Sequence, residues 1–296
     1  MSRRYASFRQ RGVAVTPYPT FQQILLIVIV GFPLAQFLVY PVVGEGSVHA
    51  GLMAAELFLL WLAVLAVRLR RWIPGDLFLL NAVPQRALWT TLLAAAGAAL
   101  VASTFDQMVA FGLKVMTWDP PLYAEQILVR VQLIDGMPSA LIVLLSVVLV
   151  PALCEETLFR GFVFTGLRYH HGPGTAIVGS AFLFAAAHLN PWQFPALFLL
   201  GLFLAGLVHW THSIYPAILG HAANNALSVL AVNVRAQTGI DLLGAVEPVP
   251  VPLVLAASVA LIVGIGWLRR IPPTMPILSP FSRPAPADGL PDSWHG

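Results

Sequence analysis

Two adjacent glutamates, Glu155 and Glu156, lie at the end of a long apolar run and are followed closely by Arg160. Glu156 and Arg160 are four residues apart, so on a helix they share a face and can form an ion pair. Glu155 would then point about 100° away as a free carboxylate. A carboxylate shielded from water can act as a general base. The motif alone leaves open that both glutamates lie where the helix meets water, one paired and one solvated.

Two histidines follow on later apolar segments. Three alanines separate Phe184 from His188 and let a neighbouring helix approach closely, so a polar group could be held against His188. His221 and Asn225 are four residues apart, and their side chains could donate hydrogen bonds to an oxyanion. Each motif alone is also explained by interhelical hydrogen bonding. Their joint occurrence with two glutamates favours a catalytic site.

The composition requires that most of the chain be surrounded by lipid. Of 296 residues, 58% are hydrophobic and 10% are charged, and the mean hydropathy is +0.81. Soluble domains contain about 25% charged residues, so this chain has far fewer charges than a soluble fold would have. The basic residues form short clusters between apolar runs, which argues against nucleic-acid binding. Cys154 is the only cysteine, so an internal disulfide and a cysteine-rich metal cluster are both excluded.

The apolar runs predict an all-α membrane bundle of about eight transmembrane helices. The predicted spans are residues 21–43, 51–67, 87–113, 137–153, 175–189, 195–210, 214–234 and 250–268. The fifth and sixth are separated by only a short polar connection, so we expect them to form a helical hairpin. The fourth is expected to continue as a helix to Thr165. We predict one transmembrane domain, 1–270, with a catalytic core at about 137–234 and a disordered cytoplasmic tail, 271–296.

The distribution of basic residues predicts the orientation. With an even number of spans, thirteen basic residues fall on the side of the termini and three on the other, so both termini are expected to be cytoplasmic. The first group is Arg3, Arg4, Arg9, Arg11, Arg68, Arg70, Arg71, Arg86, Arg160, Arg168, Arg269, Arg270 and Arg283. The second is Lys114, Arg130 and Arg235. The first span should remain uncleaved, and the segment 117–136 is expected to lie along the outer interface.

The three motifs together resemble a known family. Glu-Glu-x-x-x-Arg, Phe-x-x-x-His and His-x-x-x-Asn follow one another on successive apolar segments, over about residues 147–232. This order is similar to that of the CPBP (CAAX protease and bacteriocin-processing, or Abi) intramembrane endopeptidases. The resemblance implies that Glu155 activates water with help from His188. It also implies that His221 and Asn225 bind the oxyanion, that Glu156 and Arg160 support the site, and that Phe184 packs beside it.

The resemblance further implies hydrolysis of peptide bonds in membrane-anchored or lipidated proteins, including prenylated CAAX-type ones. We expect the reaction near the cytoplasmic half of the membrane, because Glu155 lies where the predicted fourth span meets that side. It suggests the inner (plasma) membrane of a prokaryote and implies no nucleic acid partner. Zinc could be held by Glu155, His188 and His221. The His-Glu-x-x-His motif is absent and Asn225 is a poor zinc ligand, so we favour a glutamate mechanism without a metal cofactor over a metalloprotease.

Two other functions remain open. The same polar residues could form the relay of an ion- or proton-coupled transporter, although we detect no internal repeat. The chain could also be a non-catalytic, Abi-like immunity or scaffold protein. Outside the three motifs, Cys154 is interpreted as a small buried residue. His170, His171, His209 and His212 are assigned to loops, and Glu56 and Asp106 are each either a second polar site or close enough to reach the interface.

Overall fold

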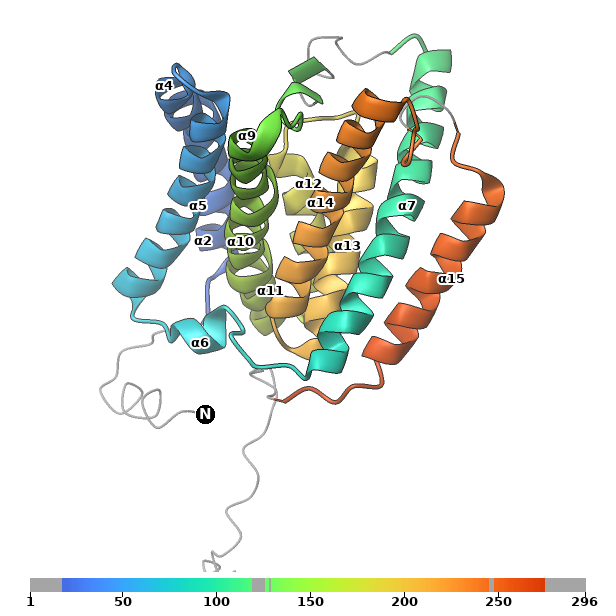
Figure 1. The fold of residues 1–296 in the computed structure, drawn as a ribbon. Coiled ribbons are helices and arrows are strands. Elements are labelled where there is room, and N and C mark those ends of the chain that lie inside the picture. The colour runs from blue at the N-terminus through green and yellow to red at the C-terminus, as the bar shows by residue number, and fades with distance from the viewer. Residues whose placement is uncertain (1–17, 119–125, 128, 245–247, 275–296) are drawn as a thin grey trace, which may run out of the picture.

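The computed structural model describes residues 18–118, 126–127, 129–244 and 248–274, and within these ranges it contains helices and no strand (Figure 1). Seven helices in the described ranges are long and apolar enough to span a membrane, which confirms a polytopic helical bundle. They are Phe21–Gly44 (α2 to α4, with π-helical turns), α5 (Val48–Arg70), α7 (Gln85–Val115), Gly136–His171, α13 (Phe194–Thr211), α14 (Tyr215–Thr238) and α15 (Val251–Leu268). The predicted fifth span is a shorter apolar helix, α12 (Pro173–Ala187).

The helix that carries the glutamates runs without a break over Gly136–His171. Its segments are α9 (Gly136–Val143), π-helical Leu144–Leu149, α10 (Val150–Glu156), π-helical Thr157–Val163 and α11 (Phe164–His171). Glu155 therefore has 19 residues of this helix before it (136–154) and 16 after it (156–171). As expected, the helix continues beyond the apolar span that ends at residue 153, and it extends past Thr165 to Gly172, where φ is +88°. Glu155 therefore lies within the bundle and not at one of its ends.

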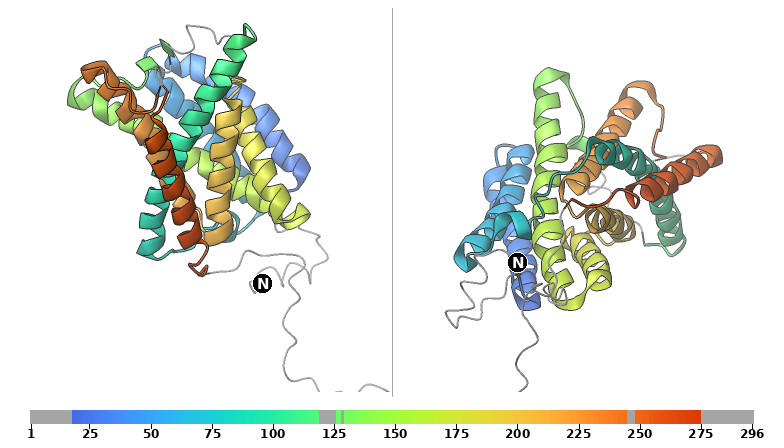
Figure 2. Two further views of the ribbon diagram at one scale, coloured as in Figure 1. Left: turned by 90° about the vertical axis from the view of Figure 1, so that its right-hand side faces the viewer. Right: turned by 90° about the horizontal axis from the view of Figure 1, so that it is seen from below.

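The neighbouring helices hold the middle of this long helix, where the glutamates lie, in place. The helix α10 packs against α5 on one side and α14 on another, and α7 packs against α13, α14 and α15 (Figures 1 and 2). The helices α12 and α13 pack against each other as a hairpin, as their short connection predicted. Val178 and Phe182 on α12 are each 53% exposed, so the hairpin has one open face.

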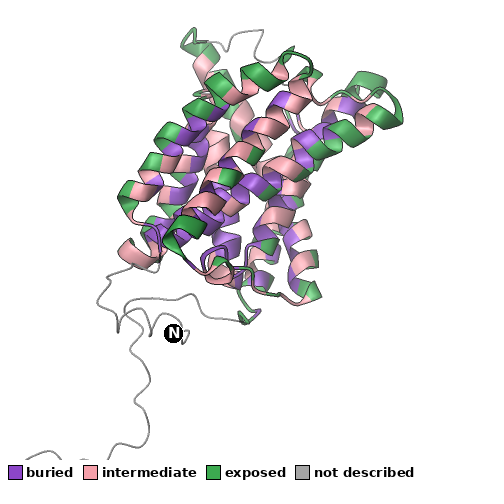
Figure 3. Cartoon of the chain, turned by 90° about the vertical axis from the view of Figure 1, so that its left-hand side faces the viewer, coloured by how far each residue is buried: buried purple, intermediate pink, exposed green. Residues whose placement is uncertain are grey.

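Large apolar side chains cover the outside of the bundle. Each long helix is buried along one face and exposed along another (Figure 3). Exposed residues include Phe37, Leu69, Trp89 and Ile262, which water would not tolerate in such numbers but lipid chains would. The fold thus buries its polar residues and presents its apolar ones to the membrane.

Both described ends of the chain lie at the same end of the bundle (Figure 1). Tyr18 contacts Tyr169, and Arg269 lies close enough to His209 to interact electrostatically. The short helix α6 (Pro74–Leu77) lies at this end as well. This arrangement fits an even number of passes, while the orientation relative to the membrane stays a prediction. Outside the described residues lie the predicted tail from residue 275, Asp119 and Glu125 of the interfacial segment, and Arg3, Arg4, Arg9, Arg11 and Arg283.

A glycine allows the close approach of α12 and α13. A Cβ at Gly201 would lie 2.9 Å from Cα and 3.2 Å from the carbonyl oxygen of Ala181, which are backbone atoms that cannot move independently. We expect Gly201→Ala to lower the free energy of unfolding by about 1–3 kcal/mol, as overpacking does. Denaturant titration in detergent measures this. The matched control is Gly266→Ala on α15, where a Cβ would meet nothing within 4 Å; equal stability of the two variants would contradict the packing argument.

Candidate active site

A fully buried ion pair lies next to the proposed catalytic residues. Arg160 Nη1 donates to Glu156 Oε1 at 2.9 Å, and both side chains are 0% exposed. Arg160 Nη2 donates to the carbonyl oxygen of Gly201 at 3.1 Å, and its guanidinium carbon lies 4.4 Å from the centre of the Phe184 ring. Buried charges require such partners, because each would otherwise have lost its hydration without compensation. The pair fixes α10 against the α12–α13 hairpin.

His221 is held by the same carboxylate. Its Nδ1 atom lies 2.9 Å from Glu156 Oε1, and the side chain is 4% exposed. Because a carboxylate only accepts hydrogen bonds, Nδ1 is the donor, which leaves Nε2 available. A neutral ring offers a lone pair at Nε2, and a protonated ring offers a second N–H. Glu156 therefore orients His221 as well as Arg160, a contact between residues 65 positions apart.

His188 is the residue that ends α12. Its Nδ1 donates to the carbonyl oxygen of Phe184 at 2.8 Å. Helix C-termini leave such carbonyls without backbone partners, and Leu189 ends the helix in the left-handed region with φ +52°. The hydrogen bond fixes the tautomer, so in the neutral ring Nε2 carries a lone pair. Nε2 lies 3.9 Å from Glu155 Oε2, and the two side chains are 29% and 10% exposed.

Glu155 and His188 can hold a nucleophile between them. Glu155 Oε2 is shielded from solvent and accepts no hydrogen bond from an N–H or hydroxyl donor of the described residues. The 3.9 Å separation from His188 Nε2 is too long for a direct hydrogen bond. A water molecule beside them could lie about 2.8 Å from each acceptor and donate one hydrogen to each. Two acceptors on one water are suited to proton abstraction.

Glu56 is a neighbour of Glu155 that sequence reasoning did not assign to the site. The helix α5 packs against α10, and the Glu56 carboxyl lies close enough to that of Glu155 to interact with it electrostatically. Its Oε2 atom is buried and accepts no hydrogen bond from an N–H or hydroxyl donor in the described ranges. In the sequence, Glu56 is a single acid within an apolar helix. Its position along that helix does not predict which residue of another helix lies beside it.

Asn225 reaches the site from α14. Its Nδ2 donates to the carbonyl oxygen of Val147 at 3.0 Å, and its side-chain oxygen accepts from Asn224 at 3.4 Å. The Val147 carbonyl is accessible because Pro151, four residues later, has no N–H to donate to it. The second hydrogen of the Asn225 amide remains available in these contacts. The Phe184 ring lies between the two histidines, with its centre 4.8 Å from that of His188 and 5.8 Å from that of His221.

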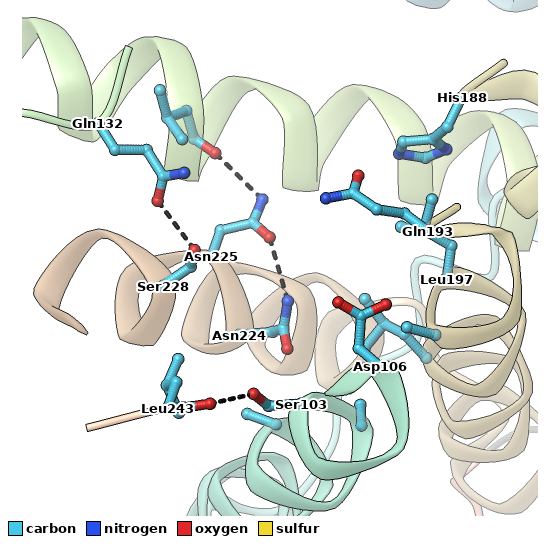
Figure 4. A pocket seen from close by; sticks show the side chains of 15 residues that line it. Ser103, Asp106, Gln132, His188, Gln193, Leu197, Asn224, Asn225, Ser228 and Leu243 are labelled. Carbon is cyan, nitrogen blue, oxygen red and sulfur yellow. Dashed lines mark hydrogen bonds between the residues drawn. The ribbon is translucent and has the colours of Figure 1, made fainter. Parts of the chain in front are cut away.

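A cavity of about 420 Å³ adjoins this cluster (Figure 4). Its wall includes His188 and Asn225, whereas Glu155 and His221 are not among the lining residues. The other lining residues are Ala99, Ala102, Ser103, Asp106, Gln132, Val147, Gln193, Ala196, Leu197, Leu200, Asn224, Ser228 and Leu243. The expected position of the site near the cytoplasmic half stays a prediction, since the orientation of the bundle relative to the membrane does as well.

Residues 137–227 match the model of the family described as type II CAAX prenyl endopeptidase, Rce1-like. The predicted resemblance is confirmed. The Rce1-like segment contains all three motifs and overlaps the predicted catalytic core, and it supports a protease that is an integral membrane protein. No curated protein and no solved structure gives a significant match.

Within the ranges that the structure describes, no group of three or more His, Cys, Asp or Glu side chains is placed to hold a metal ion. Glu155 and His188 face each other, and the Nδ1 atom of His221 is bonded to Glu156, so that only its Nε2 atom could bind a metal. A zinc ligand set would need three side chains that converge on one point. Cys154, which directly precedes the two glutamates in the chain, is a free and buried cysteine.

Proposed function

We propose that the protein is an intramembrane endopeptidase that hydrolyses peptide bonds of membrane-associated proteins. The observation that carries this proposal is the pair of acceptors, Glu155 Oε2 and His188 Nε2, which face each other across 3.9 Å beside a cavity. The Rce1-like match over residues 137–227 supports the same class of reaction. A protected carboxylate paired with an imidazole is suited to activate water without a covalent intermediate.

In the proposed mechanism, Glu155 takes one proton from a water molecule that His188 orients. The water oxygen forms a bond with the carbonyl carbon of the substrate, and negative charge moves to the carbonyl oxygen. Asn225 donates to this oxygen from its second amide hydrogen, and protonated His221 donates from Nε2. The tetrahedral intermediate then breaks its C–N bond, and the proton held by Glu155 moves to the leaving nitrogen.

The proposed substrates are membrane-anchored or lipidated proteins, including prenylated CAAX-type proteins. The cluster lies midway along a 36-residue helix, among helices that expose apolar side chains to lipid. A substrate that is itself held in the membrane could reach such a site by lateral movement. We further propose that the reaction needs no metal ion, because Glu155 and His188 can together accept both hydrogens of the water.

A cleavage assay tests the proposal. The full chain in lipid nanodiscs is incubated with membrane-anchored reporter proteins, with and without prenylation, and the products are identified by mass spectrometry. We expect cleavage by the wild type, no effect of a chelator, and a rate about 10²–10⁴-fold lower for His188→Ala. Loss of activity with the chelator and recovery with zinc would contradict the metal-free mechanism. Uncleaved reporters with the wild type would favour the transporter or scaffold alternatives.

A further inference from the structure

The cavity contains one carboxylate that the proposed mechanism does not use. Asp106 lies on α7, and Figure 4 shows its side chain directed into the cavity. It is half-buried, and it forms no hydrogen bond or ion pair with any described residue. No lysine or arginine is among the residues that line the cavity. The negative charge of Asp106 therefore has no counter-charge in this wall.

A carboxylate in such a place costs free energy unless a cation compensates it. The cation can come from a ligand, because the cavity volume of about 420 Å³ is within the range of about 300–1,000 Å³ typical of ligand sites. The same wall contains the side-chain amides of Gln193, Asn224 and Asn225 (Figure 4). Amides can both donate to and accept from a peptide backbone. His188 connects this wall to the catalytic cluster.

We propose that this cavity binds a basic side chain of the peptide substrate, with Asp106 as its ion-pair partner. The proposal rests on the proposed function and names its substrate class: peptides with a lysine or arginine close to the cleaved bond. The amides of Asn224 and Gln193 hold the adjacent backbone, and the scissile carbonyl lies on the side of His188.

Matched peptides test the charge preference. Three membrane-anchored peptides differ at one position that carries lysine, norleucine or glutamate, and their affinity and kcat/KM are measured with the full chain in nanodiscs. We expect the wild type to bind and cleave the lysine peptide about tenfold or more better than the norleucine peptide, as a partly shielded ion pair provides. Asp106→Asn should reduce this ratio to about one. Asp106→Lys should favour the glutamate peptide.

The control is Asp76→Asn, which removes a carboxylate from α6 at the far end of the bundle and should keep the wild-type ratio. Binding is measured separately from cleavage, so the two proposals can fail separately. An unchanged lysine-to-norleucine ratio in Asp106→Asn would overturn the cation site, while cleavage would still support the protease. A binding preference that Asp106→Asn removes, without cleavage of any peptide, would support the cation site and overturn the protease. Asparagine has nearly the same shape as aspartate, so the Asp106→Asn variant should stay folded. Denaturant titration in detergent checks this.

Discussion

Replacement of Glu155 by glutamine is expected to reduce kcat by about three orders of magnitude while the protein stays folded. Glutamine has the same shape as glutamate, but its amide cannot take a proton from water. The Oε2 atom that faces His188 at 3.9 Å is the proposed acceptor, so its replacement removes the chemical step and not the binding of substrate. The measurement is single-turnover cleavage of a reporter in nanodiscs, with substrate affinity determined in parallel.

Glu45→Gln is the matched control for this substitution. Glu45 is exposed in the turn between α4 (Tyr40–Gly44) and α5, far along the chain from all three motifs. It should therefore keep the wild-type rate. A Glu155→Gln variant that retains more than about a tenth of the wild-type kcat would show that this carboxylate is not the general base.

Replacement of Arg160 by methionine is expected to destabilise the protein by about 3–5 kcal/mol. The substitution leaves the Glu156 carboxylate buried without its 2.9 Å partner, and it removes the hydrogen bond to the Gly201 carbonyl. Arg160→Lys should fall between methionine and the wild type, because an ammonium group replaces the charge but not both hydrogen bonds. Denaturant titration in detergent gives the free energies of unfolding.

The double variant Glu156→Gln with Arg160→Met separates stability from catalysis. It removes both buried charges, so it should be more stable than Arg160→Met alone. Its activity should stay low, because His221 then lacks the carboxylate that accepts from its Nδ1 atom. Arg70→Met, at the exposed end of α5, is the control and should unfold like the wild type. Equal stability of Arg160→Met and Arg70→Met would contradict the structural role of the pair.

Hydropathy was sufficient to predict the bundle. The fourth apolar span was predicted as residues 137–153 and its helix as continuing to Thr165, and the helix extends further, to His171. The helix continues because Glu156 is neutralised within the bundle by Arg160. The predicted fifth span, residues 175–189, corresponds to the 15-residue helix α12 (Pro173–Ala187), which is shorter than the seven helices long enough to span a membrane.

Local spacing predicts some contacts of the candidate site and not others. The contact between Glu156 and Arg160 follows from their separation by four residues on one helix face. The hydrogen bond from His221 to Glu156 joins two helices, and no pattern within either helix indicates it. The same holds for Glu56 beside Glu155, because helix packing sets the rotation of α5 against α10. The predicted roles of these residues stay predictions until the variants are measured.

The most direct test is an experimental structure of the wild-type protein in lipid, at a resolution that shows ordered water. The account predicts one water molecule within about 3.2 Å of both Glu155 Oε2 and His188 Nε2. A metal ion at about 2.0–2.2 Å from these atoms, with an anomalous zinc signal, would contradict it. So would side chains of Glu155 and His188 that turn away from each other.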